Sequence, residues 1–284
     1  MAARAARPRQ TRPPAAVAKS KIIPVTKYDE CINMLIYGDS GVGKTVLCGT
    51  GEKSLIIGLE SGVISAGRQR STADVWPVET WQDVEDCYQY LRGTPNHGYG
   101  WVHIDSITDM QEKMLRHILD TAIEENKSRD PDIPAIQDHQ KWQNMMKRFV
   151  NLFNDLPVNV CYTALEMRRE NEEAEDIVLP LILGKDYEIS QAICGKMHVV
   201  GRMSSKVTGS GDERKVQRRI QFEHIPPYFA KDRFDCLPRF MPSPTIPKIE
   251  KLIDESGGVK HKPAVPARRR ASTRSAASRR RTSK

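Results

Sequence analysis

Short, uninterrupted apolar runs alternate with segments of helical period through most of this chain. The first clear run is CINMLIYG at residues 31–38, which has the length of a buried strand and ends in a glycine-rich loop. Residues 142–170 have the pattern of an amphipathic helix followed by a buried strand. Such alternation is typical of α/β domains with a mostly parallel sheet. It predicts strands near residues 31–37, 54–59, 74–78, 101–105 and 157–163, an edge strand within 213–225, and helices near residues 43–50, 81–92, 107–125, 139–155, 186–194 and 245–256.

Charge divides the chain into an acidic body and two basic ends. Residues 1–21 hold six basic residues and no acid, and residues 259–284 hold ten basic residues and no acid. Because the net charge is +8, the residues between them carry −8. Both ends are rich in Ala, Ser, Pro and Arg and cannot bury enough apolar surface to fold alone. We therefore expect a disordered basic arm at residues 1–25, one α/β domain at 28–255 and a disordered basic tail at 258–284.

The basic ends are suited to binding a polyanion such as nucleic acid. Neutralising phosphates with Lys and Arg gives a strong, salt-dependent affinity that is indifferent to base sequence. No aromatic residue lies among these basic residues, which argues against base stacking there. The alternative is that the ends confer only solubility, or act as a nuclear signal in a eukaryotic host.

The remaining composition argues against a membrane or secreted protein. No apolar run approaches the roughly 20 residues of a membrane span, and no hydrophobic signal core is present. The Arg- and Ala-rich start resembles a transit peptide in composition, but its prolines break a helix. None of the six cysteines forms a C-x-x-C pair, so a zinc cluster is not expected, and Cys31 and Cys161 are expected as buried free thiols. Cysteine usage of this kind suits a reducing compartment, so we expect a cytoplasmic protein.

Residues 38–45, GDSGVGKT, match the phosphate-binding pattern G-x-x-x-x-G-K-[ST]. The motif lies between a predicted strand and a predicted short helix, which is the context that gives it meaning. Its glycines let backbone N–H groups wrap phosphates, Lys44 reaches the β- and γ-phosphates, and the Thr45 hydroxyl ligates Mg²⁺. A glycine turn that binds nothing is the alternative. The expected nucleotide-binding residues are Gly38, Asp39, Ser40, Gly41, Val42, Gly43, Lys44 and Thr45.

Two acidic residues follow predicted strands and are candidates for the chemistry of this site. Asp105 ends the strand-like run WVHID, the Walker B arrangement, which would place a second metal ligand beside Thr45. Alternatively, Asp105 or Asp109 caps the helix that follows. Glu60 ends the run SLIIGLE, where a carboxylate would face the ligand crevice of an open α/β sheet and polarise the attacking water. Alternatively, Glu60 is a solvated loop acid.

The order of these motifs resembles the RecA-like ATPase core. More narrowly, residues 28–255 resemble the RecA-like nucleotide-binding proteins of tailed phages, which act in recombination and single-strand annealing. The stretches LPLILGKDYEIS (179–190) and YFAKDRFDCLP (228–238) are similar to that family's Pro-x-x-x-Gly-Lys passage and late Lys-Asp-Arg motif. The resemblance implies a RecA-like P-loop NTPase core with a mostly parallel sheet flanked by helices. It also implies ATP and Mg²⁺ as cofactors, Glu60 as the catalytic acid, and the host cytoplasm as location if the protein is phage-encoded.

The resemblance implies roles for three further residues and one loop. Lys231 and Arg233, two residues apart, would point the same way from a strand and reach the γ-phosphate of a neighbouring subunit. Thr163 would sense the γ-phosphate from a strand end. The alternatives are an exposed charged turn and an ordinary strand-end threonine. Residues 166–176 correspond to a DNA-contacting loop and are expected to be mobile, but their acidity argues against DNA contact.

Three classes of function compete for this sequence. The first is a DNA-dependent ATPase that assembles on single strands as a homo-oligomer and promotes recombination, with Glu60 and Lys44 as catalytic residues. The second is a small-molecule P-loop kinase, which needs an arginine-rich lid, whereas the one candidate lid, residues 166–176, is acidic. The third is an annealing protein that keeps nucleotide as a structural ligand. We favour the first, with single-stranded DNA bound through the basic ends and other recombination or replication proteins as further partners.

Overall fold

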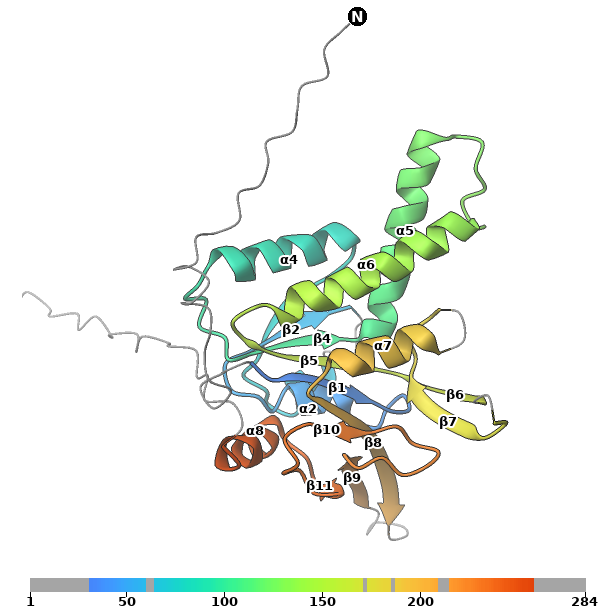
Figure 1. The fold of residues 1–284 in the computed structure, drawn as a ribbon. Coiled ribbons are helices and arrows are strands. Elements are labelled where there is room, and N and C mark those ends of the chain that lie inside the picture. Colours follow the sequence, from blue (N-terminus) through green and yellow to red (C-terminus); the bar gives the residue numbers. More distant parts are fainter. Residues whose placement is uncertain (1–30, 60–63, 171–172, 185–186, 209–214, 258–284) are drawn as a thin grey trace, which may run out of the picture.

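The central feature of the fold is a nine-stranded sheet in the order β11-β9-β8-β1-β5-β4-β2-β3, with β10 paired to β8 (Figure 1). The computed structural model describes residues 31–59, 64–170, 173–184, 187–208 and 215–257. The strands are β1 (Asn33–Tyr37), β2 (Ser54–Gly58), β3 (Asp74–Pro77), β4 (Trp101–Asp105), β5 (Asn159–Ala164), β6 (Glu166–Glu170), β7 (Asp176–Pro180), β8 (Val199–Thr208), β9 (Lys215–Gln221), β10 (Lys231–Asp232) and β11 (Phe240–Pro242). The helices are α2 (Lys44–Cys48), α3 (Ile64–Arg68), α4 (Trp81–Gly93), α5 (Ile107–Glu125), α6 (Ile136–Asn154), α7 (Glu188–Lys196) and α8 (Ile246–Glu255).

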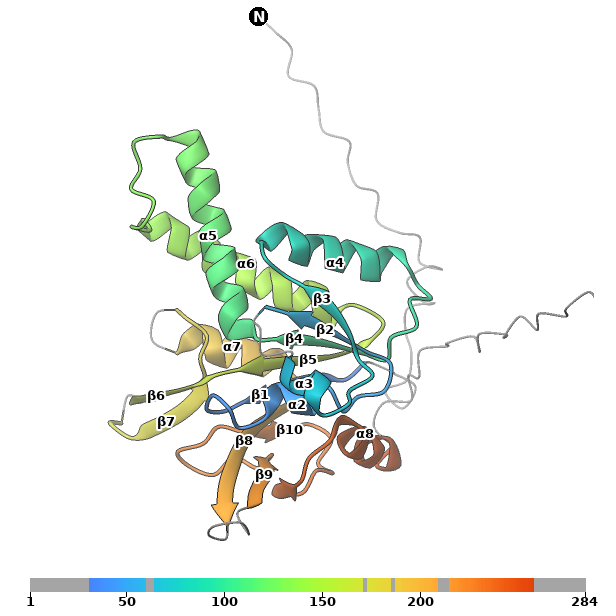
Figure 2. The ribbon, with the colours of Figure 1, turned by 180° about the vertical axis from the view of Figure 1, so that it is seen from behind.

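Helices cover both faces of the parallel part of this sheet, from β3 to β8 (Figures 1 and 2). Strand β1 is buried along its whole length, and its side chains alternate between two cores. Leu35 and Tyr37 pack into the core beneath α4, α5, α6 and α7, whereas Met34 and Ile36 face the core that contains α8. Burial on both faces explains why the central strands read as nearly continuous apolar runs.

Helices α5 and α6 are consecutive in the chain and cross each other at an angle, and the far end of α5 extends well beyond the sheet (Figure 2). Helix α6 turns one apolar stripe towards the core, with a spacing of three or four residues. Its buried apolar side chains are Trp142, Met145, Met146, Phe149, Val150 and Phe153. The start of α6 is fixed by Asp138, which accepts hydrogen bonds from Arg129 and from the backbone N–H of Ala135.

Strands β6 and β7 form a separate two-stranded antiparallel hairpin that projects from the body (Figure 1). It follows β5 after a single residue. Its base is held by Arg202 of β8, whose Nε and Nη2 lie 2.9 Å and 3.2 Å from the two carboxylate oxygens of Glu166. The Arg202 guanidinium also lies 3.8 Å from the centre of the Tyr228 ring. The expected mobile loop at residues 166–176 is therefore wrong for β6, and residues 171–172 lie outside the described residues.

The expected fold class, a P-loop α/β core with a mostly parallel sheet flanked by helices, is confirmed. All five strands and all six helices expected from the apolar pattern are present, with ends shifted by a few residues. The strand expected within 213–225 is β9, but its last three residues are not at the edge, because the short β11 pairs with them. Cys31 and Cys161 are buried, as expected. No helix of the described residues is long and apolar enough to cross a membrane.

The basic arm at 1–25 and the tail at 258–284 lie outside the described residues, so the domain limits stay predictions.

The packing of α6 predicts that Phe149→Ala lowers the free energy of unfolding by about 3–5 kcal/mol, because it leaves a cavity in a closed aromatic cluster. Phe149 is 3% exposed and contacts the rings of Trp81, Phe153 and Tyr162. The matched control is Leu152→Ala on the same helix, where the side chain is 36% exposed and the loss should stay below about 1 kcal/mol. Urea unfolding measures both, and equal losses would contradict this packing.

Candidate nucleotide-binding site

The glycine-rich loop at residues 38–45 joins β1 to α2 and packs tightly against the rest of the sheet. Gly43 is the N-cap of α2 with a φ of 106°, a left-handed conformation that favours glycine. At Gly38 a Cβ atom would lie 2.2 Å from the carbonyl oxygen of Met203 in β8. Val42 is buried and anchors the middle of the loop in the core. The loop is thus a rigid structure whose shape depends on its glycines.

Lys44 folds back over the loop that it follows. Its Nζ donates hydrogen bonds to the carbonyl oxygens of Gly38, at 2.9 Å, and Asp39, at 2.8 Å. Ser40 and Gly41, between these groups, are exposed. The ammonium group therefore lies beside an open backbone turn, where it can meet an anionic ligand.

Asp105 ends β4 and lies at the same edge of the sheet as this loop. Its carboxylate is buried and accepts a short hydrogen bond from the Thr163 hydroxyl of β5. The peptide bond to Ser106 is cis. Ser106, not Asp105 or Asp109, caps α5, because its Oγ accepts from the backbone N–H of Asp109 at 3.3 Å. The N-cap alternative is therefore wrong for Asp105, whereas Asp109 takes part in the start of α5, because its carboxylate accepts a hydrogen bond from the Ser106 hydroxyl.

Thr163 lies behind Asp105 and is not among the residues that line the cavity between the phosphate loop and the end of β4. Its side chain is fully buried, and among the described residues its hydroxyl bonds to Asp105 and to the carbonyl oxygen of Ile104, at 3.5 Å. In this structure Thr163 therefore holds the carboxylate in place. Any response to a phosphate would have to pass through Asp105.

A cavity of about 310 Å³ brings the loop and the end of β4 together. This volume lies at the lower end of the range of small-molecule sites. The donors that Thr45 and Asp105 offer are a hydroxyl and a carboxylate, the hard oxygen ligands that Mg²⁺ prefers. The residues present thus fit a phosphate chain with Mg²⁺. The lining residues are Ser40, Gly41, Gly43, Lys44, Thr45, Val46, Ser65, Asp105, Ser106, Asp109, Leu165 and Arg218.

Arg218 is a lining residue that sequence reasoning missed. It lies on β9, and its Nε donates to the carbonyl oxygen of Val42 at 3.1 Å. Its side chain lies so close to the loop that a Cβ atom on Gly43 would be 2.5 Å from Nε. The sequence offered only a basic run with strand alternation. Its position opposite the loop depends on the pairing of β8 with β1, two strands far apart in the sequence, which no local signal reveals.

Glu60, the predicted catalytic acid, lies outside the described residues. The strand that leads to it is in the expected place, because Gly58 of β2 pairs with Asp105 of β4. The backbone N–H of Leu59 also donates to the carbonyl oxygen of Asp105, at 3.1 Å. The described chain therefore ends, at Leu59, beside the backbone of Asp105.

Lys231 and Arg233 point the same way, as their spacing predicts, but away from the cavity of their own chain. Lys231 Nζ lies 3.1 Å and 3.2 Å from the carbonyl oxygens of Cys194 and Gly195, and Arg233 Nη2 lies 2.7 Å from that of Gly195. Both thus bind the end of α7, and burial lowers the pKa of Lys231. The backbone N–H of Arg233 bonds to residue 198, level with the start of β1, so both side chains lie at the sheet end opposite the loop.

Comparison with known proteins identifies one matching family. The family model described as AAA domain matches residues 30–234. Among solved structures, the flagellar accessory protein FlaH from Methanocaldococcus jannaschii is similar at 10% sequence identity and a TM-score of 0.32. The match covers 68% of this chain and 78% of that chain. A search of curated proteins found no match.

The contact between Thr163 and Asp105 predicts that Thr163→Val destabilises the protein by about 1.5–3 kcal/mol, because the buried carboxylate loses a hydrogen-bond donor. Thr163→Ser keeps the hydroxyl and is the matched control, so it should lose clearly less. Urea unfolding gives the free energies. The Mg²⁺ concentration for half-maximal ATP binding should also rise in the valine variant and not in the serine variant. Identical behaviour of the two variants in both measurements would disprove this role of Thr163.

Proposed function

The chain belongs to the AAA domain family, and we propose that it is a DNA-dependent ATPase that acts on single-stranded DNA as a homo-oligomer. The observation that carries the ATPase part is the cavity in which the loop at 38–45 meets Asp105. The DNA part is supported by the basic ends of the sequence and by its resemblance to phage recombination proteins. The proposed reaction converts ATP and water to ADP and phosphate.

In this proposal each residue of the cavity has one task. Backbone N–H groups of the loop and the Lys44 ammonium bind the phosphates. Thr45 and Asp105 hold Mg²⁺, which when bound neutralises charge that develops on the phosphate oxygens. Thr163 positions Asp105 through the hydrogen bond between them. Glu60 orients the attacking water and accepts its proton.

We propose that Arg218 acts on the phosphates within its own chain. Its guanidinium lines the cavity and is held against the phosphate loop by the carbonyl oxygen of Val42. A fixed cation at this place stabilises the charge of the transferring phosphoryl group without reorganisation.

We propose that Lys231 and Arg233 act on the nucleotide of a neighbouring subunit. The two side chains lie at the sheet end opposite their own phosphate loop, so they cannot reach a nucleotide bound by their own chain. Their shared contacts with the end of α7 keep the two cations on one side of β10. A head-to-tail assembly would bring this side to the open cavity of the next subunit, which makes the active site composite.

The proposal predicts that single-stranded DNA stimulates ATP hydrolysis by the full chain, more strongly at low than at moderate salt. Phosphate release is measured with and without DNA, beside Glu60→Gln and Lys44→Ala. Both variants should lose at least about 100-fold in kcat, because Glu60→Gln removes the general base and Lys44→Ala removes a cation that stabilises the charge on the phosphates. Lys251→Ala, an exposed lysine in an ion pair on α8, is the control and should match the parent protein. Binding of DNA without hydrolysis would instead favour an annealing protein with structural nucleotide. Hydrolysis indifferent to DNA would contradict the DNA part alone.

The composite site predicts that two inactive variants restore each other. Lys44→Ala removes the phosphate loop cation, and Arg233→Ala removes the proposed trans-acting cation. Mixed oligomers then contain interfaces that join an intact loop to an intact Arg233, so the mixture should regain ATPase activity that neither variant has alone. Arg239→Ala, an exposed arginine 3.9 Å from Glu223, is the control and should be active by itself. A mixture as inactive as its components would refute action between subunits.

A further inference from the structure

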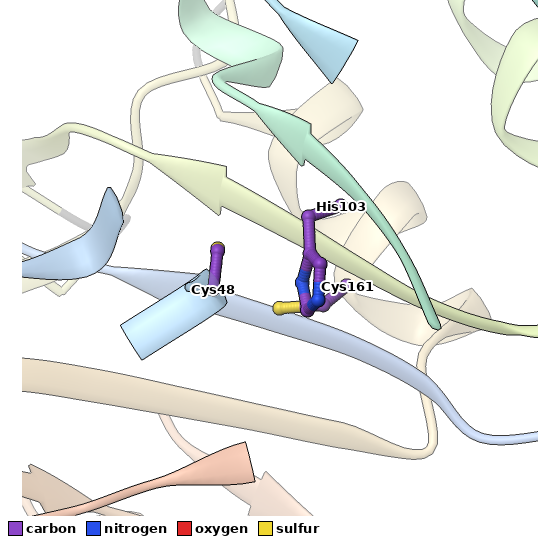
Figure 3. A group of neighbouring side chains, drawn as sticks. All are labelled: Cys48, His103 and Cys161. Atoms are coloured by element: carbon purple, nitrogen blue, oxygen red, sulfur yellow. The ribbon is translucent and has the colours of Figure 1, made fainter. Parts of the chain in front are cut away.

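Three soft or borderline metal-ligating side chains from separate parts of the chain meet in the core. Cys48 ends α2, His103 lies on β4 and Cys161 lies on β5, and all three are buried. One ligand atom from each lies within 4.8 Å of the other two. Figure 3 shows the two thiols and the imidazole ring gathered between α2 and the sheet. The sequence gives no C-x-x-C signal for this group, because its members become neighbours only through the fold.

The imidazole of His103 is incompletely satisfied within this group. Its Nε2 lies 3.1 Å from the Ser54 hydroxyl, but its Nδ1 is buried and has no hydrogen-bond partner among the described residues. An unpaired buried polar atom costs about 1–3 kcal/mol, so it calls for an explanation. If Nε2–H donates to Ser54, then Nδ1 presents a lone pair to a ligand. This is the arrangement in which a second partner orients a metal-binding histidine.

We propose that Cys48, His103 and Cys161 form a binding site for a thiolate-preferring divalent cation, of which Zn²⁺ is the best fit. Two sulfurs and one imidazole nitrogen form a donor set that selects Zn²⁺ over Mg²⁺ or Ca²⁺. Tetrahedral Zn²⁺ requires sulfur atoms about 3.8 Å apart, given Zn–S bonds of about 2.3 Å. Small side-chain rotations bring donors that already lie within 4.8 Å to such a spacing. Both thiols release their protons to solvent when the ion binds.

This site lies directly beneath the nucleotide cavity because the same three elements build both. Helix α2 carries Thr45 at the cavity and Cys48 in the cluster. In β4 and β5, Asp105 and Thr163 each follow a cluster residue by two positions, so they lie on the same face of their strands. A bound ion would therefore fasten the helix of the phosphate loop to the two strands that position the metal-binding carboxylate. This inference does not depend on DNA binding or on hydrolysis.

The test uses the full chain, purified under reducing conditions and titrated with Co²⁺ as a spectroscopic probe. We expect a thiolate-to-Co²⁺ charge-transfer band that saturates at about one ion per chain and disappears when Zn²⁺ is added. An ion held by Thr45 and Asp105 has only oxygen ligands and gives no such band. Cys48→Ala and Cys161→Ala should each abolish the band and weaken Zn²⁺ binding by more than about tenfold. Cys87→Ala, which alters an equally buried thiol on α4, is the matched control and should keep the charge-transfer band and the Zn²⁺ affinity of the parent protein.

Thermal unfolding supplies a second readout that does not depend on the spectrum. Zn²⁺ should raise the Tm of the parent protein and of Cys87→Ala, but not that of the two cluster variants. The proposal is overturned if the parent protein shows no thiolate band. It is also overturned if the band survives both cluster substitutions, or if Cys48 and Cys161 are joined by a disulfide in the reduced preparation. The first criterion, a thiolate band in the parent protein, needs no variant. The test therefore stays decisive even if a cluster variant folds poorly.

Discussion

The hydrogen-bonded register of three parallel strands, β1, β5 and β4, determines where every part of the site lies. Parallel strands bring their carboxyl ends to one edge of a sheet, and ligands of open α/β sheets bind outside that edge. Here Ile36 pairs with Thr163, and Ile104 pairs with Tyr162. The phosphate loop after β1, the threonine near the end of β5 and the carboxylate that ends β4 are therefore neighbours. A slip of one residue would turn Thr163 or Asp105 to the other face and separate their side chains.

A part of the fold or of the site could be predicted from the sequence where its pattern lies within one short stretch of residues. The phosphate loop at 38–45 and the apolar run ending in Asp105 lie within single short stretches, so the sequence placed both on the correct elements. The place of Arg218 beside the loop depends on the parallel pairing of β8 with β1, two strands that lie far apart in the sequence. Strands β6 and β7 pair as a local hairpin, but their charged side chains conceal their strand character. The polar composition of 166–176 therefore predicts a loop, although Arg202 and an antiparallel partner fix part of it.

A stronger signal was present in the central strands themselves. Strands buried on both faces are expected to be almost wholly apolar, because any polar group within them must find a partner. WVHID and NVCYTA depart from this rule at four buried residues, His103, Asp105, Asn159 and Thr163. Asp105 and Thr163 satisfy each other, whereas Nδ1 of His103 has no hydrogen-bond partner in the part of the chain that the structure describes. Polar residues at matching positions of neighbouring buried strands therefore indicate where the site lies in the sheet more directly than any one motif does.

The β6–β7 hairpin is joined directly to the site. Strand β5 carries Thr163 next to the carboxylate of Asp105 and continues through Leu165 into β6, while the pair of Arg202 and Glu166 holds the base of the hairpin against β8. The hairpin is therefore a continuation of the strand that positions the metal-binding carboxylate. Any change in the position of the end of β5 would be passed along the backbone to Glu170 and Asp176.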